Sequence, residues 1–184
     1  MLLTACTMPA SLSSHASRSS HTNGNDIAPV KKNPNVVVLT SQFKHQYASE
    51  SVQVLNIGDE IKITYLSDVL FGVGGESLLP ESTIQLTPIV NLVKRYPQVM
   101  IRIDSFTDTS GDALKNTDLS QRRAQVIQQY LITSGVRSTH LSSKGYGGSY
   151  PMVSNAEAEG RRLNRRIVVT IKNIPVPVHS ESTQ

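Results

Sequence analysis

Two neighbouring segments of the chain alternate apolar and polar residues with a period of two. They span 52–57 and 60–66, and Gly58-Asp59 lies between them as a turn signal. The alternation predicts two strands that each bury one face, and the short separation predicts an antiparallel hairpin. This hairpin constrains the fold strongly, because its apolar face has to be covered by other parts of the chain.

The segments that follow alternate between helical and strand patterns. Apolar residues recur at helical spacing over 80–95 and over 118–134, where Asp118 is the expected cap. Pro88 either kinks the first of these helices or starts it, with Thr87 as the cap. Shorter patterns predict a helix at 157–163 and strands at 100–104, 141–145 and 166–172. The order ββ-α-β-α-β-α-β predicts an α+β fold, a two-layer sandwich in which helices pack on one face of a mixed β-sheet.

The two ends of the chain differ in composition from its middle. Residues 7–35 are rich in Ser, His and Asn, contain no aromatic residue and carry one acid, so they bury too little apolar surface to offset the entropy of ordering. We therefore expect a flexible tether within 1–50, although 36–48 could also form a short strand or a docking stretch. Residues 51–172 are the expected domain, and 173–184 is expected to leave it as an extended, proline-containing tail.

The motif Leu3-Thr4-Ala5-Cys6 resembles a bacterial lipobox, in which the cysteine becomes lipidated. A secretory signal needs a basic start and about 7–15 apolar residues, so either the true start lies upstream or the match is chance. The alternative is a cytosolic protein with one free thiol. Cys6 is the single cysteine, which excludes an intrachain disulfide and a metal site of the zinc-finger type.

Composition and motifs exclude several classes of function. The longest aliphatic run is 36–39, far short of the roughly 18 apolar residues of a membrane-spanning helix. No HExxH, GxSxG or Walker sequence is present, and His140 is the one histidine within 51–172, so we expect no enzyme, no cofactor and no metal. The net charge of +4 is weak evidence for a polyanion, and without aromatic residues near the arginines we expect no nucleic acid partner.

One arginine interrupts the apolar face of the helix at 118–134. Leu119, Arg123, Val126 and Tyr130 follow the spacing i, i+4, i+7, i+11, whereas Arg122 points elsewhere. An arginine on a buried face needs an anionic partner, because an unpaired buried charge costs several kcal/mol. The alternative is that the stem of Arg123 packs while its charged end reaches water.

Asp108 is the natural counterpart of Arg123. It lies in the loop 107–111, directly after the strand expected at 100–104. One carboxylate and one guanidinium facing the same pocket would complement a zwitterion that carries an ammonium and a carboxylate. The alternative is a structural ion pair between Asp108 and Arg123 with no ligand.

These residues belong to a longer series of matches in fixed order. The chain resembles the OmpA/Pal/MotB C-terminal peptidoglycan-binding domain over about 51–172. The matching residues are Thr107-Asp108-Thr109-Ser110-Gly111, Asn116, Leu119-Ser120, Arg123-Ala124, Val126, Gly135-Val136, Gly145-Tyr146-Gly147, Pro151, Asn155 and the run from Gly160 to Ile167. The resemblance implies an OmpA-C-like sandwich and non-covalent binding of peptidoglycan at the meso-diaminopimelate of its stem peptide.

The resemblance also implies roles for individual residues. Asp108 would hold the side-chain ammonium of diaminopimelate, and Arg123 would hold its terminal carboxylate. Asn116 would order the loop between them, Phe71 would line the wall, and Thr107 belongs to the same binding set.

The basic run near the C-terminus receives a structural role from the same resemblance. Asn164, Arg165 and Arg166, together with Arg161, would tie the last helix to the sheet and to the binding loop. On this interpretation the arginines are internal ties and do not form a nucleic acid surface.

Two departures from the family pattern favour an alternative function. Ser105-Phe106 stands where the family usually has Gly-His, and the sequence after Phe71 reads Gly72-Val73-Gly74-Gly75-Glu76. Polar contacts to a ligand from that loop could come only from its backbone. The alternative is an OmpA-like fold that serves as a protein–protein scaffold and has lost peptidoglycan binding.

A lipobox-like start before such a domain resembles a narrower group, the DotK (IcmN) lipoproteins of the Dot/Icm type IVB secretion apparatus. This resemblance implies an outer-membrane lipoprotein, anchored by Cys6 at the periplasmic face. Its expected partners are peptidoglycan, outer-membrane lipid and other subunits of a secretion or envelope complex.

Overall fold

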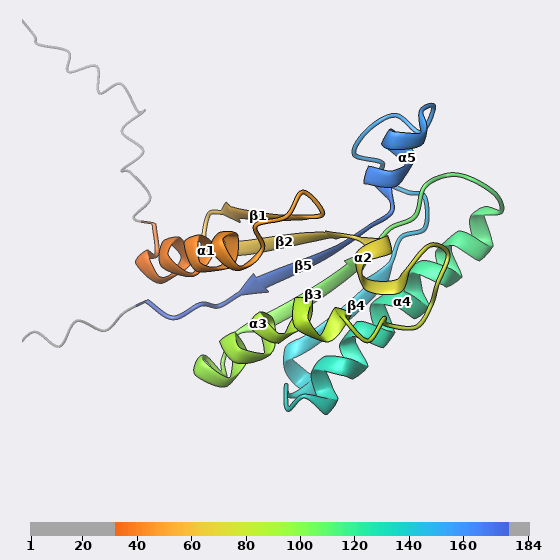
Figure 1. The fold of residues 1–184 in the computed structure, drawn as a ribbon. Helices are drawn as coiled ribbons and strands as arrows, with labels where there is room; N and C mark the ends of the chain where they lie inside the picture. Colours follow the sequence, from red (N-terminus) through yellow and green to blue (C-terminus); the bar gives the residue numbers. More distant parts are fainter. Residues whose placement is uncertain (1–31, 177–184) are drawn as a thin grey trace, which may run out of the picture. The chain divides into compact units, whose positions relative to one another are not determined.

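The computed structural model of the chain describes residues 32–176, which form a five-stranded mixed sheet in the order β1-β2-β5-β3-β4 (Figure 1). The strands are β1 (Val52–Ile57), β2 (Glu60–Leu66), β3 (Met100–Ser105), β4 (Leu141–Gly145) and β5 (Arg166–Lys172). The pairs β1·β2, β2·β5 and β3·β5 are antiparallel, and β3·β4 is parallel. The predicted hairpin and the three further strands are thereby confirmed.

The helices are α1 (Pro34–Gln46), α2 (Ser67–Phe71), α3 (Ser82–Arg95), α4 (Ala113–Thr133) and α5 (Ala158–Asn164), with a 3₁₀ turn η1 (Ser138–His140). The sheet buries alternate residues, and Ile63 lies opposite Val169, which in turn lies opposite Ile103. These side chains form one hydrophobic core with the buried faces of α1, α3 and α4. The α+β sandwich with helices on one face is confirmed (Figure 1).

The segment left ambiguous at 36–48 is a helix that belongs to the core. Pro34 occupies the first turn of α1, and the side chain of Asn33 caps it by accepting from the backbone N–H of Asn35. Val36 is fully buried and Phe43 is nearly so. A tether that extends to residue 50 is therefore wrong, because α1 packs into the hydrophobic core. Cys6 and the rest of the expected leader lie outside the described residues.

The helix α4 begins five residues earlier than its expected cap. Asp112 is the cap, and its side chain accepts from the backbone N–H of Lys115 at 2.8 Å. Asp118 instead forms an ion pair with Arg122 on the exposed side of the helix. The fully buried stripe also lies one residue further along than expected and contains Ser120, Arg123, Ala124, Ile127 and Leu131. Arg123 nevertheless lies on the buried face, as its spacing predicted.

Two smaller expectations also need correction. Pro88 lies inside α3, and the hydroxyl of Thr87 donates to the carbonyl of Thr83, so Thr87 is no cap. The expected tail does not leave the fold at 173, because Ile174 is buried and its carbonyl accepts from the amide side chain of Asn33 at 2.7 Å. Residues 177–184 lie outside the described part. Within that part, no helix has the length and apolarity needed to cross a bilayer.

Candidate ligand-binding site

Asp108 lies in the loop that connects β3 to α4, and its carboxylate is held by two partners. One oxygen accepts from the backbone N–H of Ser110 at 2.8 Å, and the other accepts from the guanidinium of Arg165 at 3.0 Å. Burial by itself would raise the pKa of Asp108, but the Ser110 N–H and the Arg165 guanidinium outweigh it and lower the pKa below its ordinary value. The carboxylate is therefore ionised, and its two partners hold it in place.

Asn116 and Thr107 hold the backbone of the same loop. The side-chain amide of Asn116 donates to the carbonyl of Ser110 at 2.9 Å and to that of Asp108 at 3.4 Å. The hydroxyl of Thr107 donates to the carbonyl of Asp108 at 2.8 Å, and Thr107 itself is buried. The Asn116 contacts suit the expected role in ordering the loop. The Thr107 hydroxyl donates its hydrogen bond within the same loop.

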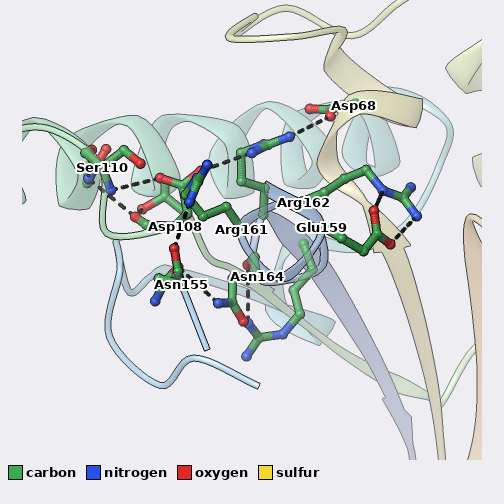
Figure 2. A network of polar contacts seen from close by, with 12 residues as sticks. Asp68, Asp108, Ser110, Asn155, Glu159, Arg161, Arg162 and Asn164 are labelled. Carbon is green, nitrogen blue, oxygen red and sulfur yellow. Dashed lines mark hydrogen bonds and ion pairs between the residues drawn. The ribbon is translucent and has the colours of Figure 1, made fainter. Parts of the chain in front are cut away.

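Arg165 bridges Asp108 to a second carboxylate, that of Asp68 on α2 (Figure 2). Its guanidinium lies 3.1 Å from Asp68 Oδ2, while Asp68 Oδ1 is buried with no hydrogen-bond partner among the described residues. The sequence reasoning missed Asp68. Its one local signal is its position three residues before Phe71, which becomes informative only once 67–71 is known to be a helical turn.

Arg123 on α4 is 1% exposed. Its Nε donates to the carbonyl of Gly75 at 2.8 Å, and its guanidinium carbon lies 5.3 Å from the centre of the Phe71 ring. Within residues 32–176, no carboxylate lies within 4.0 Å of the guanidinium. Burial lowers the pKa of Arg123, although the charges of Asp68 and Glu76 oppose that shift.

The glycine-rich loop at 72–76 covers Arg123. Gly72 has a φ of +69°, and a Cβ on Gly75 would lie 2.0 Å from the carbonyl oxygen of Phe71, so the loop path requires glycine at both positions. Glu76 at the end of the loop forms a two-pronged ion pair with Arg122 at 2.8 and 2.9 Å. The loop is thereby fastened to α4 directly beside the residue that it covers.

The two residues expected to act together do not contact each other as an ion pair. Asp108 is linked to Asp68 through Arg165, and the charge of Asp68 in turn opposes the burial that lowers the pKa of Arg123. The cluster therefore contains two carboxylates and two guanidinium groups from α2, α4, the β3–α4 loop and the residue before β5. Such a set can receive both ends of a zwitterion, with a cation beside the carboxylates and an anion at Arg123.

Asn164 and Arg166 make contacts around the end of β5. Asn164 is fully buried, donates to the carbonyl of Val153 and accepts from the N–H of Met152. Its side-chain amide also donates to Oδ1 of Asn155 at 2.9 Å (Figure 2). Arg166 donates to the carbonyl of Tyr150, and its guanidinium carbon lies 3.9 Å from the centre of the Phe106 ring. Phe106, the departure from the family pattern, thus packs against Arg166.

The sequence and the fold agree with a known family. The model of the OmpA family matches residues 70–165, and the chain belongs to that family. It is 31% identical to the probable lipoprotein YiaD of Escherichia coli over 134 residues, a stretch that covers 73% of this chain and 61% of YiaD. It is 34% identical over 103 residues to the peptidoglycan-binding protein ArfA of Mycobacterium tuberculosis, 56% of this chain and 32% of ArfA. The chain thus spans about three fifths of YiaD and a third of ArfA.

Solved structures share the fold. A MotB-like protein of Desulfovibrio vulgaris superposes with a TM-score of 0.69 at 20% identity, over 80% of this chain and 96% of that one. The cell wall anchor of the type VI secretion system of Pseudomonas aeruginosa superposes with a TM-score of 0.66 at 25% identity, over 72% of this chain and 96% of that one. The peptidoglycan-associated lipoprotein of Burkholderia pseudomallei superposes with a TM-score of 0.52 at 24% identity, over 56% of this chain and 88% of that one.

Proposed function

We propose that the chain binds peptidoglycan non-covalently, through the meso-diaminopimelate of the stem peptide. Two of the similar proteins support this function, because ArfA is described as peptidoglycan-binding and the Pseudomonas aeruginosa structure as a cell wall anchor. In this proposal the protein is a binding module with no catalytic role, and it ties an envelope assembly to the cell wall.

The observation that carries the proposal is the state of Arg123. A guanidinium that is 1% exposed normally has a carboxylate partner, because an unpaired buried charge is costly. Among the described residues Arg123 has instead a neutral carbonyl and the face of an aromatic ring. A ligand carboxylate would supply the missing charge, so the arginine is better explained as part of a binding site than as part of the core.

In the proposed complex the side chain of diaminopimelate lies across the cluster. Its ammonium contacts Asp108, with Asp68 as a second carboxylate nearby, and its carboxylate contacts Arg123. Lysine, which replaces diaminopimelate in other cell walls, lacks the distal carboxylate and would leave Arg123 unpaired. We expect discrimination of roughly 1–3 kcal/mol against lysine-type peptides.

Access to Arg123 requires movement of the loop at 72–76. The carbonyl of Gly75 occupies the position at which a carboxylate would approach Nε. Glycines at 72, 74 and 75 give this segment the backbone freedom to withdraw, and the exposed Glu76–Arg122 pair is the contact that must then break.

A sedimentation assay with purified sacculi of the diaminopimelate type tests the proposal. Asp108→Ala and Arg123→Ala should lose retention, whereas Glu159→Ala and Arg162→Ala should keep it, because these two exposed side chains form an ion pair with each other and none with the four residues of the cluster. Equal retention of all five proteins, wild type included, would rule out the proposed site. Sacculi of the lysine type provide the second arm, with weaker retention of the wild type expected.

A second candidate function is a protein–protein scaffold without wall binding. It is favoured by the fact that each charged group of the site already has an internal partner, Gly75 for Arg123 and Arg165 for Asp108. This function predicts a stable complex with a protein partner and no retention by sacculi of either type. Co-purification from native membranes, carried out beside the sedimentation assay, separates the two functions.

The location and the assembly belong to the same proposal. Cys6 would carry the lipid that holds the protein in the outer membrane at its periplasmic face, and a type IVB secretion core complex is the proposed assembly. Mass spectrometry of the N-terminal peptide from membranes should find an acylated Cys6. Cross-linking in cells should capture subunits of the secretion complex, and capture of unrelated proteins alone would contradict that assignment.

A further inference from the structure

A stack of aromatic rings lies beside the proposed stem-peptide site. Phe106 and Tyr146 are stacked with their centres 5.0 Å apart, and Tyr146 meets Tyr150 edge to face at 5.6 Å. Arg166 lies against the far side of Phe106, and Lys144 lies 4.9 Å from the Tyr146 ring. We call Phe106, Tyr146 and Tyr150 the aromatic shelf. Phe106 is buried, whereas Tyr150 is 69% exposed.

The chain holds Tyr150 in this exposed position against its backbone preference. Tyr150 has a φ of +60°, a left-handed conformation that bulky residues rarely adopt. The carbonyl of Tyr150 accepts from Arg166 at 3.0 Å, and its ring is braced by Tyr146. A strained backbone that presents a large ring to solvent is typical of a functional surface.

The shelf adjoins the loop of Asp108. The backbone N–H of Thr107 donates to the carbonyl of Gly147 at 2.8 Å, and a Cβ on Gly148 would lie 2.9 Å from the carbonyl oxygen of Asp108. Tyr150 follows Gly148 by two residues. A polymer whose side branch occupies the Asp108 cluster therefore passes close to the exposed ring.

We propose that the aromatic shelf is a subsite for the sugar backbone of peptidoglycan, with Tyr150 as the residue on which a pyranose ring stacks. The proposal rests on the proposed function, because the stem peptide is covalently attached to every second sugar of the glycan strand. The C–H face of a pyranose ring is apolar and flat, and an exposed, rigid tyrosine ring matches it at small entropic cost. Exposed Lys144 and Ser149 lie beside the shelf as partners for sugar hydroxyl groups.

Two soluble ligands that differ only in the sugars test the shelf. The probes are a tripeptide that ends in meso-diaminopimelate and the same tripeptide attached to its disaccharide, each titrated into the protein by calorimetry. The wild type should bind the disaccharide form roughly threefold to tenfold more tightly. Tyr150→Asn should remove that difference and leave the affinity for the bare tripeptide unchanged.

The choice of variants keeps a folding defect apart from a loss of contact. Asparagine tolerates a positive φ, so Tyr150→Asn relieves the strain while it removes the ring. Tyr150→Phe keeps the ring and should keep the preference for the disaccharide form. Ile57→Ala, at an apolar position of β1 that is 50% exposed, is the matched control and should behave as the wild type.

The outcomes separate the shelf from the proposed function. Equal affinity of the wild type for the two probes, or a preference that survives in Tyr150→Asn, overturns the shelf and leaves stem-peptide binding intact. If neither probe binds, the proposed function fails, and glycan strands stripped of peptides by an amidase then test the shelf alone. Retention by those strands that is lost in Tyr150→Asn supports the shelf, and absence of retention overturns it.

Discussion

The two charged halves of the candidate site are built in opposite ways. Asp108 is surrounded by donors, with the Ser110 N–H and the Arg165 guanidinium on its two oxygens. Arg123 is more deeply buried, yet its one hydrogen-bond acceptor among the described residues is the carbonyl of Gly75. The acid is satisfied within the protein, and the arginine is covered without being neutralised.

This difference indicates that the two residues contribute to different properties. Asp108 takes part in a network that ties α2, the β3–α4 loop and the start of β5, so it contributes to stability as well as to the site. Arg123 carries a desolvation cost with no ion pair to offset it, so its presence is best explained by a ligand. Substitutions at the two positions should therefore change stability and binding in different proportions.

The largest expected effect is the loss of binding in Arg123→Met. Methionine fills a similar volume and removes the buried charge, so affinity for diaminopimelate peptides should fall by roughly 2–4 kcal/mol. The free energy of unfolding should stay within about 1 kcal/mol of the wild type or rise. Calorimetric titration and urea denaturation measure the two quantities, and a large loss of stability with intact binding would reverse the assignment.

Asp108→Asn should show the opposite proportion. The amide keeps the shape but loses the charged partner of Arg165, and the free energy of unfolding should fall by about 1–3 kcal/mol. Urea denaturation of Asp108→Asn, Arg165→Gln and the double variant measures their coupling. If the loss of unfolding free energy in the double variant equals the sum of the losses in the two single variants, the Asp108–Arg165 contact does not stabilise the fold.

The lowered pKa of Asp108 predicts how stability responds to acid. In the unfolded chain this carboxyl has the ordinary aspartate pKa of about 3.9. In the native protein its pKa is lower, so it takes up its proton only at lower pH. The stabilising contribution is therefore complete above about pH 5 and is lost as the pH falls through the lowered folded value. Urea titrations between pH 5 and pH 2.5 should show a shallower pH dependence in Asp108→Asn than in the wild type.

The smallest expected effect is a gain of affinity in Glu76→Gln. The exposed Glu76–Arg122 ion pair fastens the glycine-rich loop over Arg123, so weakening it should raise the population of the open loop. Affinity for the peptide should rise roughly twofold to threefold, as expected for a surface pair. Glu159→Gln breaks a similar exposed pair with Arg162 and should leave the affinity unchanged. An equal gain in both variants would point to a general charge effect.

Local patterns in the sequence were sufficient wherever one element decided the outcome. The alternation of 52–57 and 60–66 placed both strands of the hairpin, because a period of two has a single way to bury one face. The run Val36-Val37-Val38-Leu39 was left open between a short strand and a docking stretch, because four consecutive apolar residues show no period. Packing against the core settled it as a helix.

The sequence by itself determined the fold class, the family pattern and the position of Arg123 on a buried helix face, since these depend on periodicity and on motifs close together in the chain. The tertiary structure alone decided which charges meet. Asp68 and Asp108 are 40 positions apart and share Arg165, and Gly75 reaches Arg123 from another loop. Hydrogen bonds and ion pairs act over a few ångströms of space, and no spacing along the chain encodes which distant loops come within that range.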